Sequence, residues 1–337
     1  MKTPESDAKA GVSGEGFLCR RRMLTLSHLI GLHREKMRAR IEINACQKTG
    51  EAFSHTLLTG YGGCGKTALA RAIGNELGYH FVEVEGIVYK HRGDLVKALL
   101  NHTSQAQRLG RFLLLFIDEI HRLKPTVQEA LYLPMKEWKL TTTEGEIRLP
   151  FFTVFGATTR FDMLDSNSFV TRFGNLWEIQ RYDLDDMAAI VASELRKLNL
   201  SFTRDVVYAI AQRSLGIPRI AADTLVPKIR LSVLAEGGAE VTMYHCENVF
   251  DLEGIDHLGL NDIHRRYLSI VSSAVLGGKP MPLGVGSIAG KMRQPEDVIT
   301  GSVEPILLEM ELIASTPRGR VITQAGTEYL KKVTEVV

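Results

Sequence analysis

The segment GYGGCGKT, residues 60–67, has the residue types and spacing of a phosphate-binding loop. It fits G-x-x-x-x-G-K-[ST] at every fixed position and lies between an apolar segment and a helical pattern. Backbone N–H groups of such a loop surround the phosphates, while Lys66 would reach the β and γ phosphates and Thr67 would hold Mg²⁺. The sequence therefore predicts a nucleotide site formed by Gly60, Gly62, Gly63, Cys64, Gly65, Lys66, Thr67 and Ala68.

Two carboxylates end the apolar segment FLLLFIDE at residues 112–119. Ligands bind at the carboxyl edge of parallel sheets, so these acids would face the same site as the phosphate loop. Asp118 would hold Mg²⁺, directly or through water, and Glu119 would polarise the attacking water. The alternative is a solvated pair of acids at a strand end.

Further polar residues could complete a site for phosphoryl transfer. Thr158 and Thr159 end the next apolar segment, where a hydroxyl can contact the γ-phosphate or the attacking water. Arg172 and Arg219 could stabilise charge on the transferring phosphoryl group, although each could equally be a solvated surface residue.

The elements that must position these residues alternate between strand and helix patterns from about residue 56 to residue 160. The pattern predicts a parallel sheet with helices on both faces, built from strands at 55–60, 80–86, 112–119 and 151–159. A helix is expected before the sheet, over residues 29–48, with an apolar stripe of Ile30, Met37, Ile41 and Ala45. Residues 183–250 are predicted to be helical, without a strand.

A third unit begins at about residue 256. Helices are predicted at 262–276, 285–292 and 295–312, followed by a hairpin whose turn, TPRG at 316–319, suits type I. Three helices closed by a β-hairpin is the order of a winged-helix domain. Residues 256–337 carry nine Lys and Arg against nine Asp and Glu, so any nucleic-acid surface must be local.

The composition argues against a globally basic protein and against one that spans a membrane. The formal charge of the 337 residues is only +2, and no apolar run approaches the roughly 20 residues of a membrane span. Residues 1–20 are expected to be a disordered tail, and they lack the apolar core of a signal peptide. The four cysteines show no metal-ligand or disulfide spacing, which favours a reducing cytoplasm.

Five segments, in this order, resemble one family. IDEIHRL (117–123), GATTR (156–160), RFG (172–174), PRIA (218–221) and TPRGRV (316–321) are similar to the motifs of RuvB, the AAA+ motor that migrates Holliday junctions. The resemblance covers about residues 21–330, and its last segment, in a winged helix, makes it specific. It implies an AAA+ P-loop ATPase domain over 21–181, a helical lid domain over 182–255 and a winged-helix domain over 256–337.

The resemblance also implies roles that the residues alone do not give. Thr159 would be the sensor, Arg172 a finger acting on a neighbouring subunit, and Arg219 a second sensor in cis. Arg22, Ile30 and Tyr182 match positions that frame the adenine of ATP in the family. Arg318 and Arg320 match positions that contact DNA. A hexameric ring on duplex or four-way-junction DNA, with ATP and Mg²⁺ as cofactors and RuvA as partner, is implied as well.

The chain departs from the family pattern at several positions. Tyr61 and Gly62 stand where two prolines are usual, and Cys64, at a usually aliphatic position, is either a redox-sensitive thiol or a small packing residue. Ser315 replaces a residue that is often basic. The hairpin expected at 138–150, with its turn at Glu144-Gly145, is shorter and more polar than the one that docks RuvA, which weighs against a RuvA-like partner.

Three functions fit these observations. The first is an ATP-dependent DNA motor, and the second is an AAA+ loader or switch that assembles on DNA without branch migration. The third is a DNA-binding adaptor whose nucleotide only controls oligomerisation. The presence of Lys66, Asp118, Glu119 and Arg172 argues against the adaptor, because a pure adaptor needs no hydrolytic residues.

Overall fold

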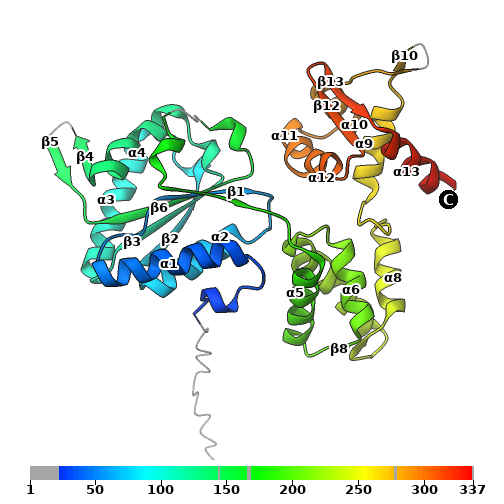
Figure 1. Cartoon of the computed structure of the whole chain (residues 1–337), viewed down its shortest axis with the longest axis horizontal. Helices are drawn as coiled ribbons and strands as arrows, with labels where there is room; N and C mark the ends of the chain where they lie inside the picture. Colours follow the sequence, from blue (N-terminus) through cyan, green and yellow to red (C-terminus); the bar gives the residue numbers. More distant parts are fainter. Residues whose placement is uncertain (1–22, 143–144, 165–167, 277–278, 336–337) are drawn as a thin grey trace, which may run out of the picture.

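The computed structural model describes residues 23–142, 145–164, 168–276 and 279–335. A sheet covered by helices forms one end of the molecule, and a helical region and a C-terminal region lie together at the other end (Figure 1). The expected tail at residues 1–20 and the candidate residue Arg22 lie outside the described residues.

Five parallel strands form the sheet in the order β2-β3-β6-β1-β7. The four predicted strands are confirmed as β1 (Thr56–Gly60), β2 (His80–Glu85), β3 (Leu113–Asp118) and β6 (Phe152–Thr158). The fifth, β7 (Asn175–Ile179), was not predicted from the sequence. It is an edge strand that pairs with β1 alone, and only Trp177 and Ile179 on its inner side are buried, so its apolar signal is short.

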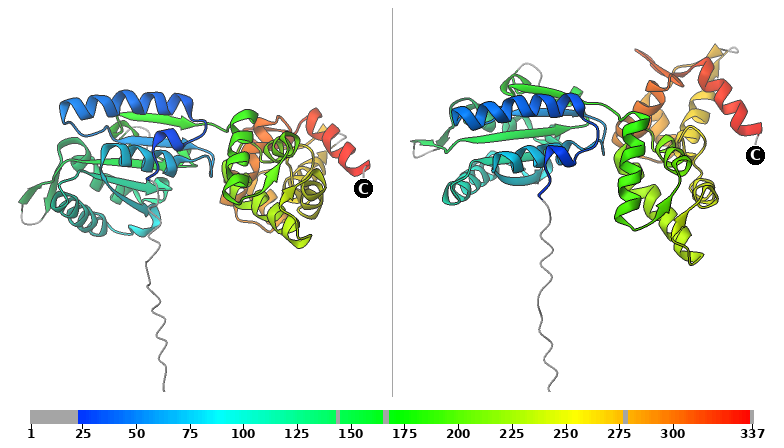
Figure 2. Two further views of the ribbon diagram at one scale, coloured as in Figure 1. Left: turned by 90° about the horizontal axis from the view of Figure 1, so that it is seen from below. Right: turned by 60° about the horizontal axis from the view of Figure 1, so that its bottom comes forward.

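Helices cover both faces of the sheet, as predicted (Figure 2). Side chains of α1 (His33–Thr49) and α2 (Lys66–Leu77) pack with Leu58, Leu114 and Phe116 on one face. Side chains of α3 (Arg92–Arg108) and α4 (Pro125–Glu137) pack with their strand neighbours Leu57 and Leu115 on the other. Successive strand residues thus feed opposite core clusters, and β3 is buried on both sides.

The predicted apolar stripe of α1 was wrong. Met37 and Ile41 are 66% and 69% exposed, whereas Ala39, Ile43 and Cys46 are buried against the sheet. Small residues on the buried face allow close approach to the strands, and the larger apolar residues were therefore misleading. The helix also begins at His33 rather than at residue 29, after Leu32 in a left-handed conformation (φ 52°).

The region after the sheet consists mainly of α5 (Leu184–Lys197), α6 (Arg204–Arg213), α7 (Val226–Ala235) and α8 (Met243–Leu252). A π-helical turn, Ile220–Leu225, precedes α7. The prediction of a strand-free region was wrong in one detail, because β8 (Ser201–Phe202) and β9 (Glu240–Val241) pair in parallel.

The C-terminal region is a winged helix. Its elements are α9 (Asp262–Ser272), β10 (Val275–Leu276), β11 (Lys279–Pro280), α10 (Val285–Met292), α11 (Glu296–Val298), a π-helical segment (Ile299–Val303), α12 (Glu304–Glu309), β12 (Ile313–Thr316), β13 (Gly319–Ile322) and α13 (Gln324–Glu335). The helix predicted to reach residue 276 ends at Ser272, because the next residues pair as β10 and β11. The terminal helix α13 was not predicted.

A separate hairpin, β4 (Lys139–Thr142) and β5 (Gly145–Arg148), projects from the sheet domain (Figure 1). Gly145, expected at the turn, is the first residue of β5 and pairs with Thr142. Residues 143 and 144 lie outside the described residues. Among the described helices, none has both the length and the apolar character needed to cross a membrane.

Candidate active site

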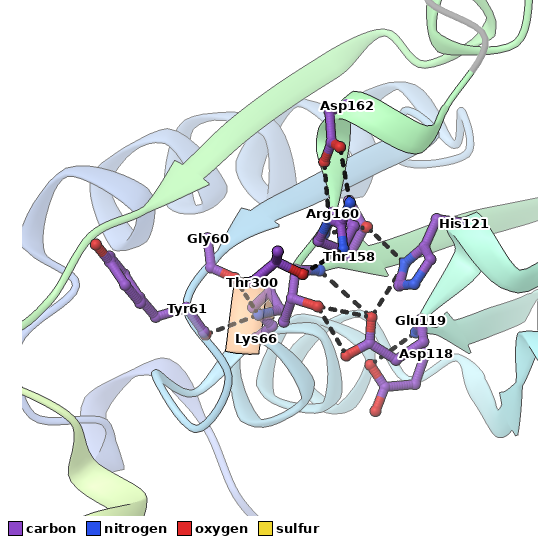
Figure 3. A network of polar contacts seen from close by, with 11 residues as sticks. Gly60, Tyr61, Lys66, Asp118, Glu119, His121, Thr158, Arg160, Asp162 and Thr300 are labelled. Carbon is purple, nitrogen blue, oxygen red and sulfur yellow. Dashed lines mark hydrogen bonds and ion pairs between the residues drawn. The ribbon is translucent and has the colours of Figure 1, made fainter. Parts of the chain in front are cut away.

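The carboxyl ends of three neighbouring strands bring the predicted site residues together (Figure 3). The phosphate loop follows β1, the two acids end β3, and the two threonines end β6. Because β6 lies between β3 and β1 in the sheet, the threonines stand between the acids and the phosphate loop.

The phosphate loop is folded around the ammonium of Lys66. Its Nζ donates hydrogen bonds of 2.8 Å to the carbonyl oxygens of Gly60 and Tyr61. Gly63 has φ 81°, and a Cβ there would lie 2.5 Å from the Cβ of Arg219, so only glycine permits this packing. The backbone N–H of Arg219 also donates to the Gly63 carbonyl (3.3 Å), which ties the helical region to the loop.

Cys64 is fully buried behind the loop. Burial raises the pKa of its thiol to about 11, although the nearby cation Lys66 acts in the opposite direction. A protonated and inaccessible thiol reacts slowly with oxidants. The structure therefore favours the packing interpretation of Cys64 over the redox-sensitive thiol.

Glu119 is held by the residues around it. It adopts a left-handed conformation (φ 46°), which is costly for a residue with a side chain. The Thr159 hydroxyl donates to its carboxylate at 3.1 Å, and His121 Nδ1 lies 3.1 Å from the same oxygen. His121 Nδ1 also contacts the Thr158 hydroxyl at 2.9 Å, so one imidazole spans the ends of β3 and β6 (Figure 3).

The charged groups of the site respond differently to burial. Burial would raise the pKa of Glu119, but hydrogen bonds from His121 and Thr159 outweigh it and lower that pKa to about 2. Burial raises the pKa of Asp118 and lowers the pKa of Lys66. Glu119 is therefore an ionised acceptor at neutral pH, and the other two groups would gain from bound partners of opposite charge.

A cavity of about 480 Å³ lies over these residues, closed on one side by the segment before α1 and on the other by the helical region. The predicted site residues that line it are Ile30, Gly62, Gly63, Gly65, Lys66, Thr67, Ala68, Asp118, Glu119, Tyr182 and Arg219. Tyr182 donates from its hydroxyl to the Cys64 carbonyl at 3.3 Å, so it also holds the loop. Thr159 lies behind Glu119 rather than on the cavity wall.

Arg172 does not line this cavity. Arg172 ends the 3₁₀ turn Val170–Arg172, and its guanidinium carbon lies 5.2 Å from the ring centroid of Tyr132. Within the described residues its Nε is buried and has no hydrogen-bond partner. Arg172 and Arg219, which looked alike in the sequence, thus occupy different places.

Sequence reasoning missed several residues of the site. His121 and Arg160 lie in the segments IDEIHRL and GATTR. The sequence signal for them was their position, two residues after Glu119 and directly after Thr159. The helical region also lines the cavity with Ile190, Glu194 and Asp223, for which no motif exists.

The two arginines of the β12–β13 hairpin, which forms the wing of the winged helix, differ in their surroundings. Pro317 and Arg318 connect β12 to β13 without positive φ, as the predicted type I turn requires, and Arg318 is exposed at the tip. Arg320 instead donates from Nε and an Nη to one carboxylate oxygen of Glu304, at 3.1 and 2.9 Å. Glu304 is buried and also accepts a 2.7 Å hydrogen bond from Tyr267. The guanidinium of Arg320 is thus occupied inside the winged helix.

The similarity of the chain to known proteins agrees with this arrangement. A family model of the Holliday junction DNA helicase RuvB P-loop domain matches residues 21–179, and one of the RuvB C-terminal winged helix domain matches residues 257–331. The Holliday junction branch migration complex subunit RuvB of Paracoccus denitrificans (strain Pd 1222) is 33% identical over 313 residues, which cover 90% of this chain and 88% of that protein. The chain belongs to the RuvB family.

Solved structures of RuvB have the same architecture. The RuvB Holliday junction branch migration motor of Thermotoga maritima superposes with a TM-score of 0.81 at 30% identity, covering 91% of this chain and 97% of that one. A mutant of Thermotoga maritima RuvB gives a TM-score of 0.82 at 29% identity, covering 91% and 98% of the two chains. As a member of the RuvB family, the chain is a P-loop ATPase with a helical middle region and a C-terminal winged helix.

Proposed function

We propose that the chain is an ATP-dependent DNA motor that drives branch migration of Holliday junctions as a ring of identical subunits in the cytoplasm. The observation that carries this proposal is the convergence of the phosphate loop, Asp118, Glu119 and Thr159 at one sheet edge, in a chain of the RuvB family that also has a winged helix. We divide the chain into an ATPase domain (21–181), a lid domain (182–255) and a winged-helix domain (256–337).

Bound ATP would occupy the 480 Å³ cavity, with the adenine between the segment before α1 and the lid, near Ile30 and Tyr182. Lys66 and Arg219 would contact its phosphates, and Thr67 and Asp118 would hold Mg²⁺. A hydroxyl and one carboxylate suit this ion, which keeps its other positions for phosphate and water. Mg²⁺ would neutralise charge that develops on the phosphates, and Glu119 would orient the attacking water.

A neighbouring subunit would complete the site. Arg172 lies outside the cavity of its own chain, which supports a role on the phosphates of another subunit. A head-to-tail interface forms a ring when its rotation closes, and we propose a hexameric ring.

The hairpin 138–150 bears on the choice of partners. Its strands carry Lys139, which contacts Glu137 at 3.5 Å and Glu146 at 3.6 Å, while Ile147 is 39% exposed. A short charged hairpin offers little apolar area for docking. We therefore propose that junction DNA is bound without an obligatory RuvA-like protein. The second candidate function is a loader that assembles on DNA and hydrolyses ATP without moving a junction.

Dissociation of a synthetic four-way junction tests the motor. We expect the purified protein with ATP and Mg²⁺ to separate the arms with or without added RuvA. The Glu119→Gln variant should bind ATP and DNA but fail to separate the junction arms, because loss of a general base lowers turnover about 10²- to 10⁴-fold. Hydrolysis in one burst with intact junctions in both reactions would instead support the loader.

Arg318→Ala is expected to weaken DNA binding for every sequence, because a contact from this exposed arginine to a phosphate does not depend on the base. The slope of log affinity against log salt concentration should fall by about one unit for each wing that contacts DNA. Lys331→Ala, the same charge change on α13, is the matched control. Equal slopes for the wild type and Arg318→Ala would remove the wing tip from the DNA interface.

A further inference from the structure

Tyr61 joins the phosphate loop to the winged helix. Its hydroxyl donates to Glu309 Oε2 at 2.7 Å and lies 3.3 Å from the carbonyl oxygen of Pro305, both on α12. This contact spans 248 residues of sequence. It depends on the hydroxyl that distinguishes Tyr61 from a proline at this place in the loop.

Arg181 makes the contact three-sided. One of its Nη atoms lies 2.5 Å from Glu309 Oε1, and its guanidinium carbon lies 5.6 Å from the centroid of the Tyr61 ring. Its other Nη donates to the carbonyl oxygen of Leu215 in the helical region. The cluster therefore connects all three parts of the chain.

The protonation states suit a stable contact at neutral pH. Burial would raise the pKa of Glu309, but hydrogen bonds from Arg181 and Tyr61 lower it. Burial and the hydrogen bond to Glu309 raise the pKa of Tyr61 to about 12. Tyr61 is thus a neutral donor to an ionised acceptor, a stronger pair than two neutral groups.

The same residue is a partner of the lysine that binds phosphate. The backbone carbonyl of Tyr61 accepts the 2.8 Å hydrogen bond from Lys66 Nζ (Figure 3). A phosphate that contacts Lys66 would compete with this carbonyl for the ammonium. Movement of Lys66 would then free the Tyr61 peptide while its side chain is still held by Glu309.

A second contact links the winged helix to the catalytic loops. Arg160, the residue after Thr159, donates to the Thr300 hydroxyl at 2.9 Å, and Thr300 lies in the π-helical segment before α12 (Figure 3). Asp162 fixes the same guanidinium through two hydrogen bonds. The winged helix therefore contacts the loops after both β1 and β6.

We propose that Tyr61, Arg181 and Glu309 form a latch that holds the winged helix against the phosphate loop and is released when nucleotide phosphates draw Lys66 away. The three are positioning residues, since they act on the phosphate loop and not on the reacting atoms. The latch would transmit the state of the ATP site to the domain that grips DNA, and in this sense it rests on the proposed function.

Linkage fixes the direction of the expected effect. If nucleotide binding weakens the latch, then the latch weakens nucleotide binding by the same factor. Removing the latch must therefore strengthen nucleotide binding by that factor. We expect Tyr61→Phe, which keeps the ring and loses the hydroxyl, to bind ADP and a non-hydrolysable ATP analogue about 5-fold more tightly, at the lower end of coupling factors because Glu309 is half-exposed. Glu309→Gln should behave alike.

The double variant and a control identify the contact itself. Tyr61→Phe combined with Glu309→Gln should strengthen nucleotide binding by less than the two single effects combined, because both variants weaken the same Tyr61–Glu309 contact. Glu311→Gln is the control, since it makes the same charge change at an exposed position two residues away. Titration calorimetry on the full chain gives these affinities.

A distance measurement reports the latch directly. Spin labels at Asn44→Cys on α1 and Ala325→Cys on α13, both exposed, span the ATPase domain and the winged helix. Cys46, Cys64 and Cys246 are buried, and Cys19 is replaced by serine in this background. We expect ADP to lengthen the distance in the wild type and Tyr61→Phe to show the longer distance before ADP is added.

Unchanged or weaker nucleotide binding in both single variants would overturn the latch, as would additive effects in the double variant or a distance that neither ADP nor Tyr61→Phe changes. None of these measurements requires DNA movement. A chain that fails to separate junctions would therefore contradict the proposed function and leave the latch standing. A chain that separates junctions but shows none of the expected nucleotide effects would overturn the latch and leave the proposed function standing.

Discussion

Arg172→Ala is expected to lower ATP turnover by about 10³-fold or more, the range found for arginine fingers, while ATP binds with wild-type affinity. The two effects separate because Arg172 does not line the cavity of its own chain, yet a transferring phosphoryl group needs a cation beside it. Steady-state hydrolysis and equilibrium binding of a fluorescent ATP analogue measure the two quantities. Arg108→Ala, at an exposed position on α3, is the control.

Mixed rings decide whether the arginine acts between subunits. An inactive Arg172→Ala subunit still has Lys66, and an inactive Lys66→Ala subunit still has Arg172. In an equal mixture about one quarter of head-to-tail interfaces combine the two intact residues, and activity should rise toward that fraction of the wild-type rate. A mixture as inactive as its components would show that Arg172 does not serve a neighbour. Wild-type turnover by Arg172→Ala alone would remove the residue from catalysis.

Local patterns were sufficient for the parts of the site that lie at strand ends. The phosphate loop, Asp118 and Glu119 each follow directly from an apolar segment, and parallel strands necessarily bring their carboxyl ends to one edge. The same local patterns predicted four strands of the sheet and, in the winged helix, helices followed by a hairpin, but not β10, β11 or α13.

The mistakes have two physical causes. In α1 two of the three buried residues, Ala39 and Cys46, are small, whereas the exposed Met37 and Ile41 are large and apolar, so the sequence pattern favoured the wrong face. Other features depend on contacts between distant residues, such as Tyr61 with Glu309, which no spacing rule connects. A polar residue reveals its role only when the fold supplies its partner.

Arg320→Ala is expected to destabilise the winged helix by about 3–5 kcal/mol, the usual cost of leaving a buried charge unpaired. Glu304 is 3% exposed and Arg320 23% exposed, so solvent would compensate little for the lost guanidinium. At about 1.4 kcal/mol per tenfold change, hydrogen-exchange protection of α9 and α12 in the full chain should fall by about 10²-fold or more. Protection in β2 and β3, on the side of the sheet away from β1 and Tyr61, is the internal control.

Replacement of both partners separates this structural role from DNA contact. Glu304→Gln with Arg320→Met keeps an acceptor for Tyr267 and leaves no unpaired charge, so protection should return to within about 1–2 kcal/mol of the wild type. If Arg320 mainly holds the wing in place, DNA binding should recover with stability in this double variant, in contrast to Arg318→Ala. A stable double variant that still binds DNA weakly would show that Arg320 leaves Glu304 to contact phosphate. Wild-type protection in Arg320→Ala would mean that the ion pair is dispensable for the wing.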